Sequence, residues 1–173
     1  YAGSHMQTHA ARHMALGSLN NAGLADAVLG TLGMTSYAAS FRYSQPQLAG
    51  GINTSANVYT AFLRKLLRQD LVAGSQLNAH ARCTNPLTCA SAIETPFPTT
   101  ESPNYSIGHW VEDTLVADGA YSSAGAFGFY PWIEPTKAYY GVLVRTVLVG
   151  KPALDSVACG RKLRLAWATG VAS

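Results

Sequence analysis

The sequence contains little charge. Of its 173 residues, 12 are lysine or arginine and 9 are aspartate or glutamate, so charged side chains make up 12% and the formal net charge is +3. The basic residues fall into two small groups, within 64–68 and 151–164. Such groups are typical of solvated helix faces with cations near a helix C-terminus, whereas nucleic-acid-binding domains usually carry a stronger basic stripe. The sequence therefore predicts no nucleic acid partner.

Long hydrophobic runs are also missing. The longest apolar run, Tyr139–Val149, is interrupted by Arg145. It is shorter than the roughly 20 apolar residues that a membrane-spanning helix needs. We therefore expect no membrane span.

Cysteine is scarce, with three residues in the chain. Five residues separate Cys83 and Cys89 in a loop-like segment, a spacing that can close a small disulfide loop. A disulfide is typical of a secreted or otherwise exported protein. The alternative, a metal site, needs more soft ligands than this segment offers. Cys159 is left over and is expected to be a buried structural thiol.

Histidines are few, but three of the five share one spacing. A helix is predicted over 5–16 with Ser4 as its N-cap, and it would place His5, His9 and His13 on one face. This spacing permits a metal site, yet no carboxylate or fourth ligand stands nearby in the sequence. A polar helix face explains the pattern as well, and we expect neither a metal nor a cofactor.

Helical periodicity predicts three further helices, over 22–32, 56–68 and 155–167. Gly33 is placed to end the first in a left-handed conformation. Thr54 or Ser55 is placed to cap the second and Ser156 the third. The intervening segments 35–47 and 74–103 show no sustained period and are expected to be loops, of which the longer is of the kind that often borders a binding cleft.

The segment Gly119–Gly141 predicts a β-hairpin. Its first arm, Ser122–Trp132, would be extended, Glu134–Lys137 would form the turn, and Tyr139–Val149 would return. Gly125 inside the first arm indicates that another group approaches the backbone closely. Since Tyr105–Val111 adds a third extended run, the sheet should be antiparallel. The predicted fold class is α/β, an antiparallel sheet flanked by helices, within a single domain over 1–173.

One part of this hairpin resembles a known family. Gly125–Ile133, with the sequence GAFGFYPWI, resembles the strand that lines the active site of the β-lactamase-related serine hydrolases, which include class C β-lactamases, D-Ala-D-Ala carboxypeptidases and serine esterases. Tyr1–Gly3 resembles the family's Tyr-x-Asn element, and Leu32–Thr35 its "LGM" turn. Leu48–Ala56 is similar to its "AGG…TSA" helix start, and Tyr105–Val111 to its "YGLGW" strand. These segments stand in the family's order, and the resemblance implies a β-lactamase/transpeptidase-like fold.

The family's nucleophile has no counterpart in this chain. In the family, the serine of a Ser-x-x-Lys element forms an acyl-enzyme, because a serine hydroxyl is a weak nucleophile until a nearby base takes its proton. No serine here is followed three residues later by lysine, and in the family this element lies upstream of the tyrosine. The resemblance thus implies the C-terminal portion of a β-lactamase-like domain, whose partner is an upstream segment or chain that carries the nucleophile.

The family's Tyr-x-Asn element has a partial counterpart. Tyr1 is expected to be the catalytic residue that relays protons. Gly3 replaces the asparagine of the Tyr-x-Asn element, which removes an amide that would help to hold a substrate carbonyl.

Substrate-binding residues are expected on the strand. Ala120–Ser122 stands where the family has Lys-Thr-Gly, so the lysine that would attract a substrate carboxylate is missing. This loss favours a neutral ester or amide substrate. Ser122 and Ser123 are expected to offer a backbone amide to an oxyanion hole. Gly125 and Phe127 are expected to line the substrate.

These expectations describe an exported, esterase- or amidase-like serine hydrolase that is inactive as this chain alone. Loss of the lysine and of the asparagine leaves an alternative open, namely a catalytically inactive binding or scaffolding module of the same fold.

Overall fold

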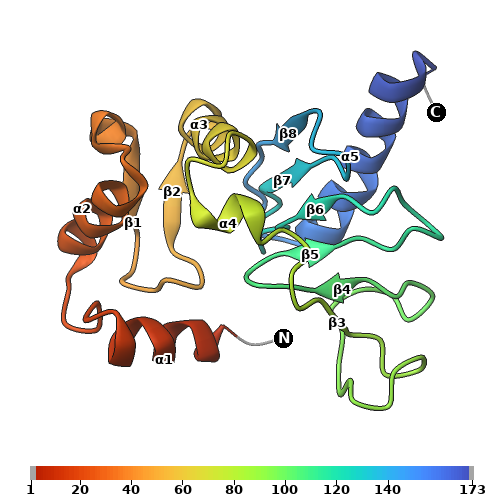
Figure 1. Cartoon of the computed structure of the whole chain (residues 1–173), viewed down its shortest axis with the longest axis horizontal. Helices are drawn as coiled ribbons and strands as arrows, with labels where there is room; N and C mark the ends of the chain where they lie inside the picture. Colours follow the sequence, from red (N-terminus) through yellow and green to blue (C-terminus); the bar gives the residue numbers. More distant parts are fainter. Residues whose placement is uncertain (1–2, 172–173) are drawn as a thin grey trace. The chain divides into compact units, whose positions relative to one another are not determined.

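The computed structural model describes residues 3–171, which form a mixed α/β fold (Figure 1). The chain divides into two compact units, one up to Phe62 and one from Leu63 onward. Each unit is described by itself. Helix α3, Ala56–Leu67, spans the boundary.

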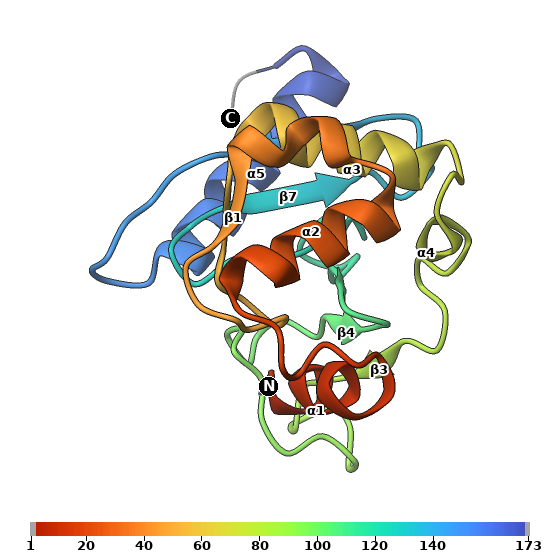
Figure 2. The same cartoon turned by 90° about the vertical axis from the view of Figure 1, so that its left-hand side faces the viewer.

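The first unit combines helices with a small hairpin. Its elements in order are α1 (Ser4–His13), α2 (Asn21–Leu32), the 3-10 helix η1 (Thr35–Ser40), β1 (Phe41–Tyr43), β2 (Ile52–Thr54) and the start of α3. β1 and β2 pair in an antiparallel manner, and α2 lies against β1 and η1 (Figure 2). The expected loop over 35–47 is therefore wrong in part, because it contains η1 and β1.

The helix ends of the first unit follow local capping chemistry. The side chain of Asn20 accepts a hydrogen bond from the Gly23 amide at 2.9 Å and so begins α2. Gly33 adopts the left-handed conformation, with φ 61°, and ends the helix as expected. The hydroxyl of Ser55 accepts a bond from the Val58 amide at the start of α3. The expected cap at Ser4 is wrong, because Ser4 is already the first residue of α1.

The second unit is built on a six-stranded antiparallel sheet, which confirms the expected strand direction. The strands are β3 (Arg82–Cys83), β4 (Asn104–Tyr105), β5 (Trp110–Val111), β6 (Tyr121–Ser122), β7 (Tyr130–Ile133) and β8 (Tyr140–Leu143), and they neighbour one another in sequence order. The short helix α4 (Val72–Ser75) precedes the sheet and the long helix α5 (Pro152–Thr169) follows it. Among residues 3–171, no helix combines the length and hydrophobicity that a bilayer crossing requires.

Two predicted strands are each divided by a turn. The run Tyr105–Val111 forms two paired strands, because Gly108 turns the chain with φ 75° and brings Tyr105 opposite Trp110. Likewise, Ser122–Trp132 is not one extended arm. Gly125 and Gly128 form the turn between β6 and β7, in which the Gly128 amide donates to the Gly125 carbonyl at 2.9 Å. These two glycines therefore serve a turn, and Gly128 has a positive φ of 93°, which glycine adopts readily.

Helix α5 packs on the sheet through its small residues. The core of the unit contains Trp110, Tyr130, Trp132 and Val157. A Cβ atom at Gly160 would overlap the ring of Tyr130, so glycine permits this close approach. The helix begins at Pro152, a residue suited to the first turn because its missing N–H leaves no bond unmade.

Two expectations about α5 are wrong. Ser156 does not cap the helix; it lies inside the helix, fully buried, and its hydroxyl donates to the Gly128 carbonyl at 2.8 Å. Cys159 is a free thiol, as expected, but it is exposed and not buried.

The long connection over 74–103 is held by its own polar groups. Cys83 and Cys89 form a disulfide, which confirms the predicted pairing. Asn85 is almost fully buried, and its side-chain amide donates to the carbonyls of Thr99 and Glu101, both at 2.9 Å. The expected loop over 74–103 is wrong in part, because it contains the end of α4 and the strand β3. In the irregular remainder, these bonds satisfy backbone groups that would otherwise be buried without a partner.

Candidate functional site

The two serines expected to bind substrate lie at the end of β6. Ser122 is 3% exposed, and its hydroxyl has no hydrogen-bond partner among the described residues. Ser123 is exposed, and its amide donates to the Pro131 carbonyl at 3.2 Å. The Ser123 amide, one of the two expected to face an oxyanion, is thus engaged within the sheet.

The other predicted site residues are placed differently. Gly125 and Phe127 lie in the turn between β6 and β7, and the Phe127 side chain is 58% exposed. The Phe127 carbonyl accepts a bond from the Val147 amide at 2.9 Å, which ties this turn to the segment before α5. Tyr1, the expected catalytic residue, lies outside the described residues.

The second unit also buries an ion network that was not predicted. Its centre is Arg164 of α5, whose side chain is 2% exposed. The guanidinium donates two bonds to Asp118, at 2.7 and 2.8 Å, and one to Glu112 at 2.8 Å. A further bond of 2.6 Å reaches the hydroxyl of Tyr130, which itself donates to Glu112. This planar, multiply bonded geometry is one that arginine provides and lysine cannot.

A second arginine extends the network. Arg161, one turn earlier on α5, donates to Glu112 at 3.0 Å and to Glu101 at 2.8 Å. Two arginines therefore face three carboxylates, those of Glu101, Glu112 and Asp118. Since the Glu112 side chain is fully buried, its charge depends on these two arginines for compensation.

The network shifts the acidity of its members in consistent directions. Burial opposes the charge of Arg164, but the hydrogen bond to Asp118 and the charge of Glu112 outweigh it and raise its pKa. Burial works against the Asp118 carboxylate too, yet its bonds with Arg164 lower its pKa. Burial and the charge of Glu112 raise the pKa of Tyr130. At neutral pH Arg164 and Asp118 are therefore both charged and the Tyr130 phenol is neutral.

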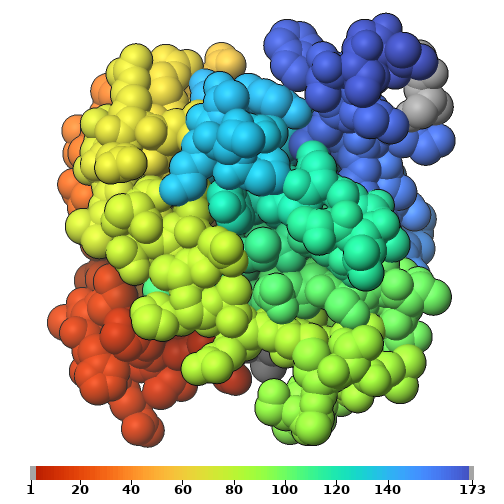
Figure 3. Space-filling model, turned by 45° about the vertical axis from the view of Figure 1, so that its right-hand side comes forward, coloured from red at the N-terminus to blue at the C-terminus, as the bar shows by residue number. Residues whose placement is uncertain are grey.

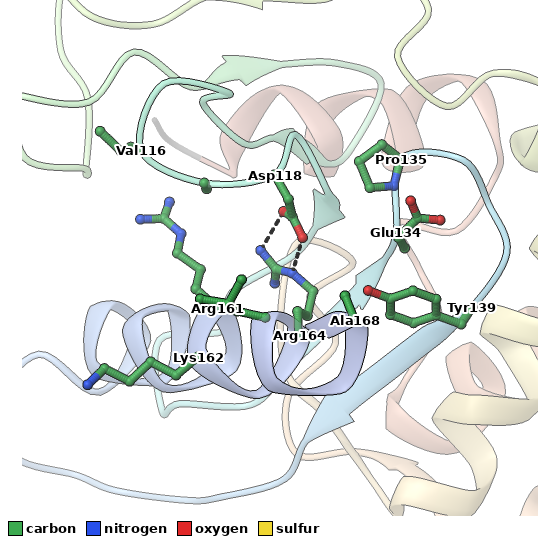
Figure 4. A pocket seen from close by; sticks show the side chains of 11 residues that line it. Val116, Asp118, Glu134, Pro135, Tyr139, Arg161, Lys162, Arg164 and Ala168 are labelled. Carbon is green, nitrogen blue, oxygen red and sulfur yellow. Dashed lines mark hydrogen bonds and ion pairs between the residues drawn. The ribbon is translucent and has the colours of Figure 1, made fainter. Parts of the chain in front are cut away.

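One side of this network lines a pocket of about 480 Å³. The surface is hollowed where the segment before β6, the β7–β8 turn and α5 come together (Figure 3). Figure 4 shows Asp118 and Arg164 joined in the middle, with Arg161 on one side and Glu134 and Tyr139 on the other. The lining residues are Val116, Ala117, Asp118, Glu134, Pro135, Tyr139, Arg161, Lys162, Arg164, Leu165 and Ala168.

The pocket offers charge and apolar surface. The described residues that line it include no serine, threonine, cysteine or histidine. Glu134 is tied to its own turn, where it accepts bonds from Thr136 at 2.6 Å and from the Ala138 amide at 3.2 Å. None of Ser122, Ser123, Gly125 and Phe127 lines this pocket, so the structure does not bring the predicted substrate residues together with it.

The histidines of α1 do not form a metal centre in the structure. The rings of His9 and His13 lie 5.3 Å apart, which confirms that they share a face. Among residues 3–171, no group of three or more histidine, cysteine, aspartate or glutamate side chains is arranged to hold a metal ion.

The sequence contains a faint signal for the ion network. Glu112 and Asp113 directly follow the apolar residues of β5, although acidic residues are rare in this chain. Arg161 and Arg164 stand three residues apart and so share a helix face. The expectation that the basic residues of 151–164 are solvated is wrong for these two arginines.

Comparisons of this chain with protein-family models, with curated proteins and with solved structures found no match. The family resemblance therefore depends on the sequence motifs alone.

Proposed function

We propose that this chain is the C-terminal portion of an exported β-lactamase-like serine hydrolase, with the nucleophile on an upstream Ser-x-x-Lys segment. It would act on a small neutral ester or amide through an acyl-enzyme. One observation carries the proposal: parts of the segments that resemble the family's "YGLGW" strand, its Lys-Thr-Gly strand and its active-site strand lie on the neighbouring strands β5, β6 and β7 of one sheet.

The strand register supports this proposal. Trp110 of β5 lies opposite Ser122 of β6, and Ser122 lies opposite Trp132 of β7. Turns join the three segments in the sequence, and the strands pair in sequence order. Their adjacency is what a shared active-site wall needs.

The chemistry of β6 supports a neutral substrate. Ala120 is fully buried, and Tyr121 and Ser122 follow it, so this strand carries no cation. A substrate carboxylate would lack the charge-assisted hydrogen bond that a lysine there provides. The disulfide between Cys83 and Cys89 supports export, since such bonds persist in oxidising compartments.

The test is fluorophosphonate labelling of the native preparation, followed by intact mass spectrometry. We expect label on a serine of an upstream Ser-x-x-Lys segment, and no label on the 173-residue chain produced alone. The chain alone should also leave p-nitrophenyl acetate unhydrolysed above the rate of a heat-denatured control. Stoichiometric label on a serine of this chain, or ester hydrolysis by it alone, would contradict the proposal.

A second candidate is a catalytically inactive binding or scaffolding module of the same fold. It is favoured by the paired amide of Ser123 and by the absence of a cation on β6. The same labelling experiment separates the two. If the upstream segment has lost the serine or the lysine and no label appears, the binding module is the correct function.

A further inference from the structure

The imidazole of His109 holds a segment that is distant in the sequence. His109 lies at the end of the turn between β4 and β5. Its Nε2 atom accepts a hydrogen bond from the Asn78 amide at 3.1 Å. Its Nδ1 atom lies 3.1 Å from the Ile107 carbonyl. The ring thus joins the β4–β5 turn to the segment that connects α4 with β3.

These two bonds fix the protonation state of the ring. A backbone N–H can donate to Nε2 only when that nitrogen carries no proton. Nδ1 faces a carbonyl, which only accepts, so Nδ1 carries the proton. His109 is therefore neutral, with its hydrogen on Nδ1. An imidazolium would present a second N–H to the Asn78 amide, and the two donors would repel each other.

The held segment contains two residues in the left-handed backbone region. Asn78 and His80 adopt positive φ values of 69° and 55°, a conformation that is uncommon for residues other than glycine. Ser106, also in the β4–β5 turn, donates its hydroxyl hydrogen to the Ala79 carbonyl. Two side chains of one turn thus hold two consecutive residues of the other segment, Asn78 and Ala79.

We propose that His109 is a pH-sensitive latch: as a neutral ring it holds the segment 76–80 against the β4–β5 turn, and when protonated it releases that segment. The segment leads directly into β3, the edge strand of the sheet. Opening the latch therefore loosens the chain at the sheet edge, while the Ser106 bond remains as a tether.

The surroundings of the ring set the direction of the switch. Burial lowers the pKa of His109, against a smaller opposing effect of the Ile107 carbonyl. Tyr121 of β6 packs edge-on against the ring, with centroids 5.9 Å apart. The held segment contains His80, and Arg82 of β3 follows it. The held segment, β3 and the β4–β5 turn therefore contain no carboxylate that would stabilise an imidazolium. The latch is closed at pH 7 and opens as the pH falls below the ordinary histidine pKa of 6.5.

Backbone amide exchange in the full chain tests the latch. Protection factors of the Asn78 amide, corrected for intrinsic exchange, would be measured between pH 8 and pH 4.5. We expect protection in the natural sequence to fall roughly three- to tenfold as the pH drops, the change that loss of one hydrogen bond produces. In H109Q, whose side-chain oxygen accepts a bond at every pH, protection should be flat. In the matched control H80Q, which alters an exposed histidine of the same segment, the fall should persist.

A second measurement keeps the test decisive if H109Q does not fold. Nuclear magnetic resonance titration of the natural chain follows the His109 ring and the Asn78 amide together. A shared midpoint below pH 6.5 supports the latch. Constant protection across this range, different midpoints for the two groups, or an unchanged transition in H109Q would overturn it.

Discussion

Gly160 is the residue at which α5 comes closest to the sheet. An added methyl group would overlap the ring of Tyr130, although alanine is a better helix former than glycine by about 1 kcal/mol. We expect the overlap to dominate, so that G160A lowers the free energy of unfolding by about 1–3 kcal/mol. Urea denaturation followed by tryptophan fluorescence would measure this change.

A matched control lies in α2. A Cβ atom at Gly30 meets no atom of the described residues within 4 Å. G30A should therefore show the helix preference alone and raise the free energy of unfolding by up to about 1 kcal/mol. If G160A were as stabilising as G30A, this result would contradict the close packing of α5 on Tyr130.

Arg164 is the residue on which the buried carboxylate of Glu112 most depends. R164M keeps the aliphatic stem but leaves Glu112 with Arg161 as its remaining cation. We expect a loss of about 3–5 kcal/mol in the free energy of unfolding, because removal of Arg164 leaves the buried Glu112 charge only partly compensated. K162M, at the neighbouring exposed residue, should change it by less than about 0.5 kcal/mol. Equal stability of R164M and the natural chain, measured by urea denaturation, would contradict this role.

At the scale of elements, the disulfide loop anchors the long connection before β4. Closing a loop of this size stabilises the folded chain by roughly 2 kcal/mol in the chain-entropy treatment. The double variant C83A/C89A should lose about that amount, and dithiothreitol should bring the natural chain to the same denaturation midpoint. C159A removes the exposed free thiol and should leave the midpoint unchanged. A midpoint insensitive to reduction would show that Asn85 and its carbonyl partners hold the connection without the disulfide.

Elements with local signals were predictable from the sequence. The helices α2 and α3 carry an apolar period together with Gly33 and Ser55 as end signals, and the structure has both helices within one residue of the expected ends. The strands of β3 to β6 contain only two residues each, which is too short for an alternating pattern to appear. The sequence therefore predicts a strand through Gly108, although this residue turns the chain.

The candidate site was less predictable, because its contacts join distant residues. Arg164 and Glu112 are 52 residues apart, and the sequence around either residue does not predict the other as its partner. Ser122 was found on a strand, as its neighbours suggested, but the engaged amide of Ser123 depends on the register of β6 against β7. Register is set by the whole sheet and its turns, so a single segment does not reveal it.

At the scale of the molecule, the ion network predicts how stability depends on acid. The pKa of Asp118 is lowered in the folded chain, so its contribution to stability is complete above its ordinary pKa of 3.8. That contribution is lost as the pH falls through the lower folded value. The melting temperature of the natural chain should therefore exceed that of D118N at pH 6, and the difference should shrink below pH 3.8. D26N, at an exposed aspartate of α2, should track the natural chain at both pH values, and a constant difference for D118N would contradict the assignment.

The position of Arg164 near the end of α5 also has a consequence for protein synthesis. Glu112 leaves the ribosome 52 residues before Arg164, and at about 5–20 residues per second the interval lasts several seconds. During that time the Glu112 carboxylate beside β5 lacks Arg164, with which it pairs in the folded chain. We expect the nascent sheet to remain open to water until α5 emerges, so that the second unit closes late in translation, and a chaperone that binds unfinished chains would meet this segment in its open form.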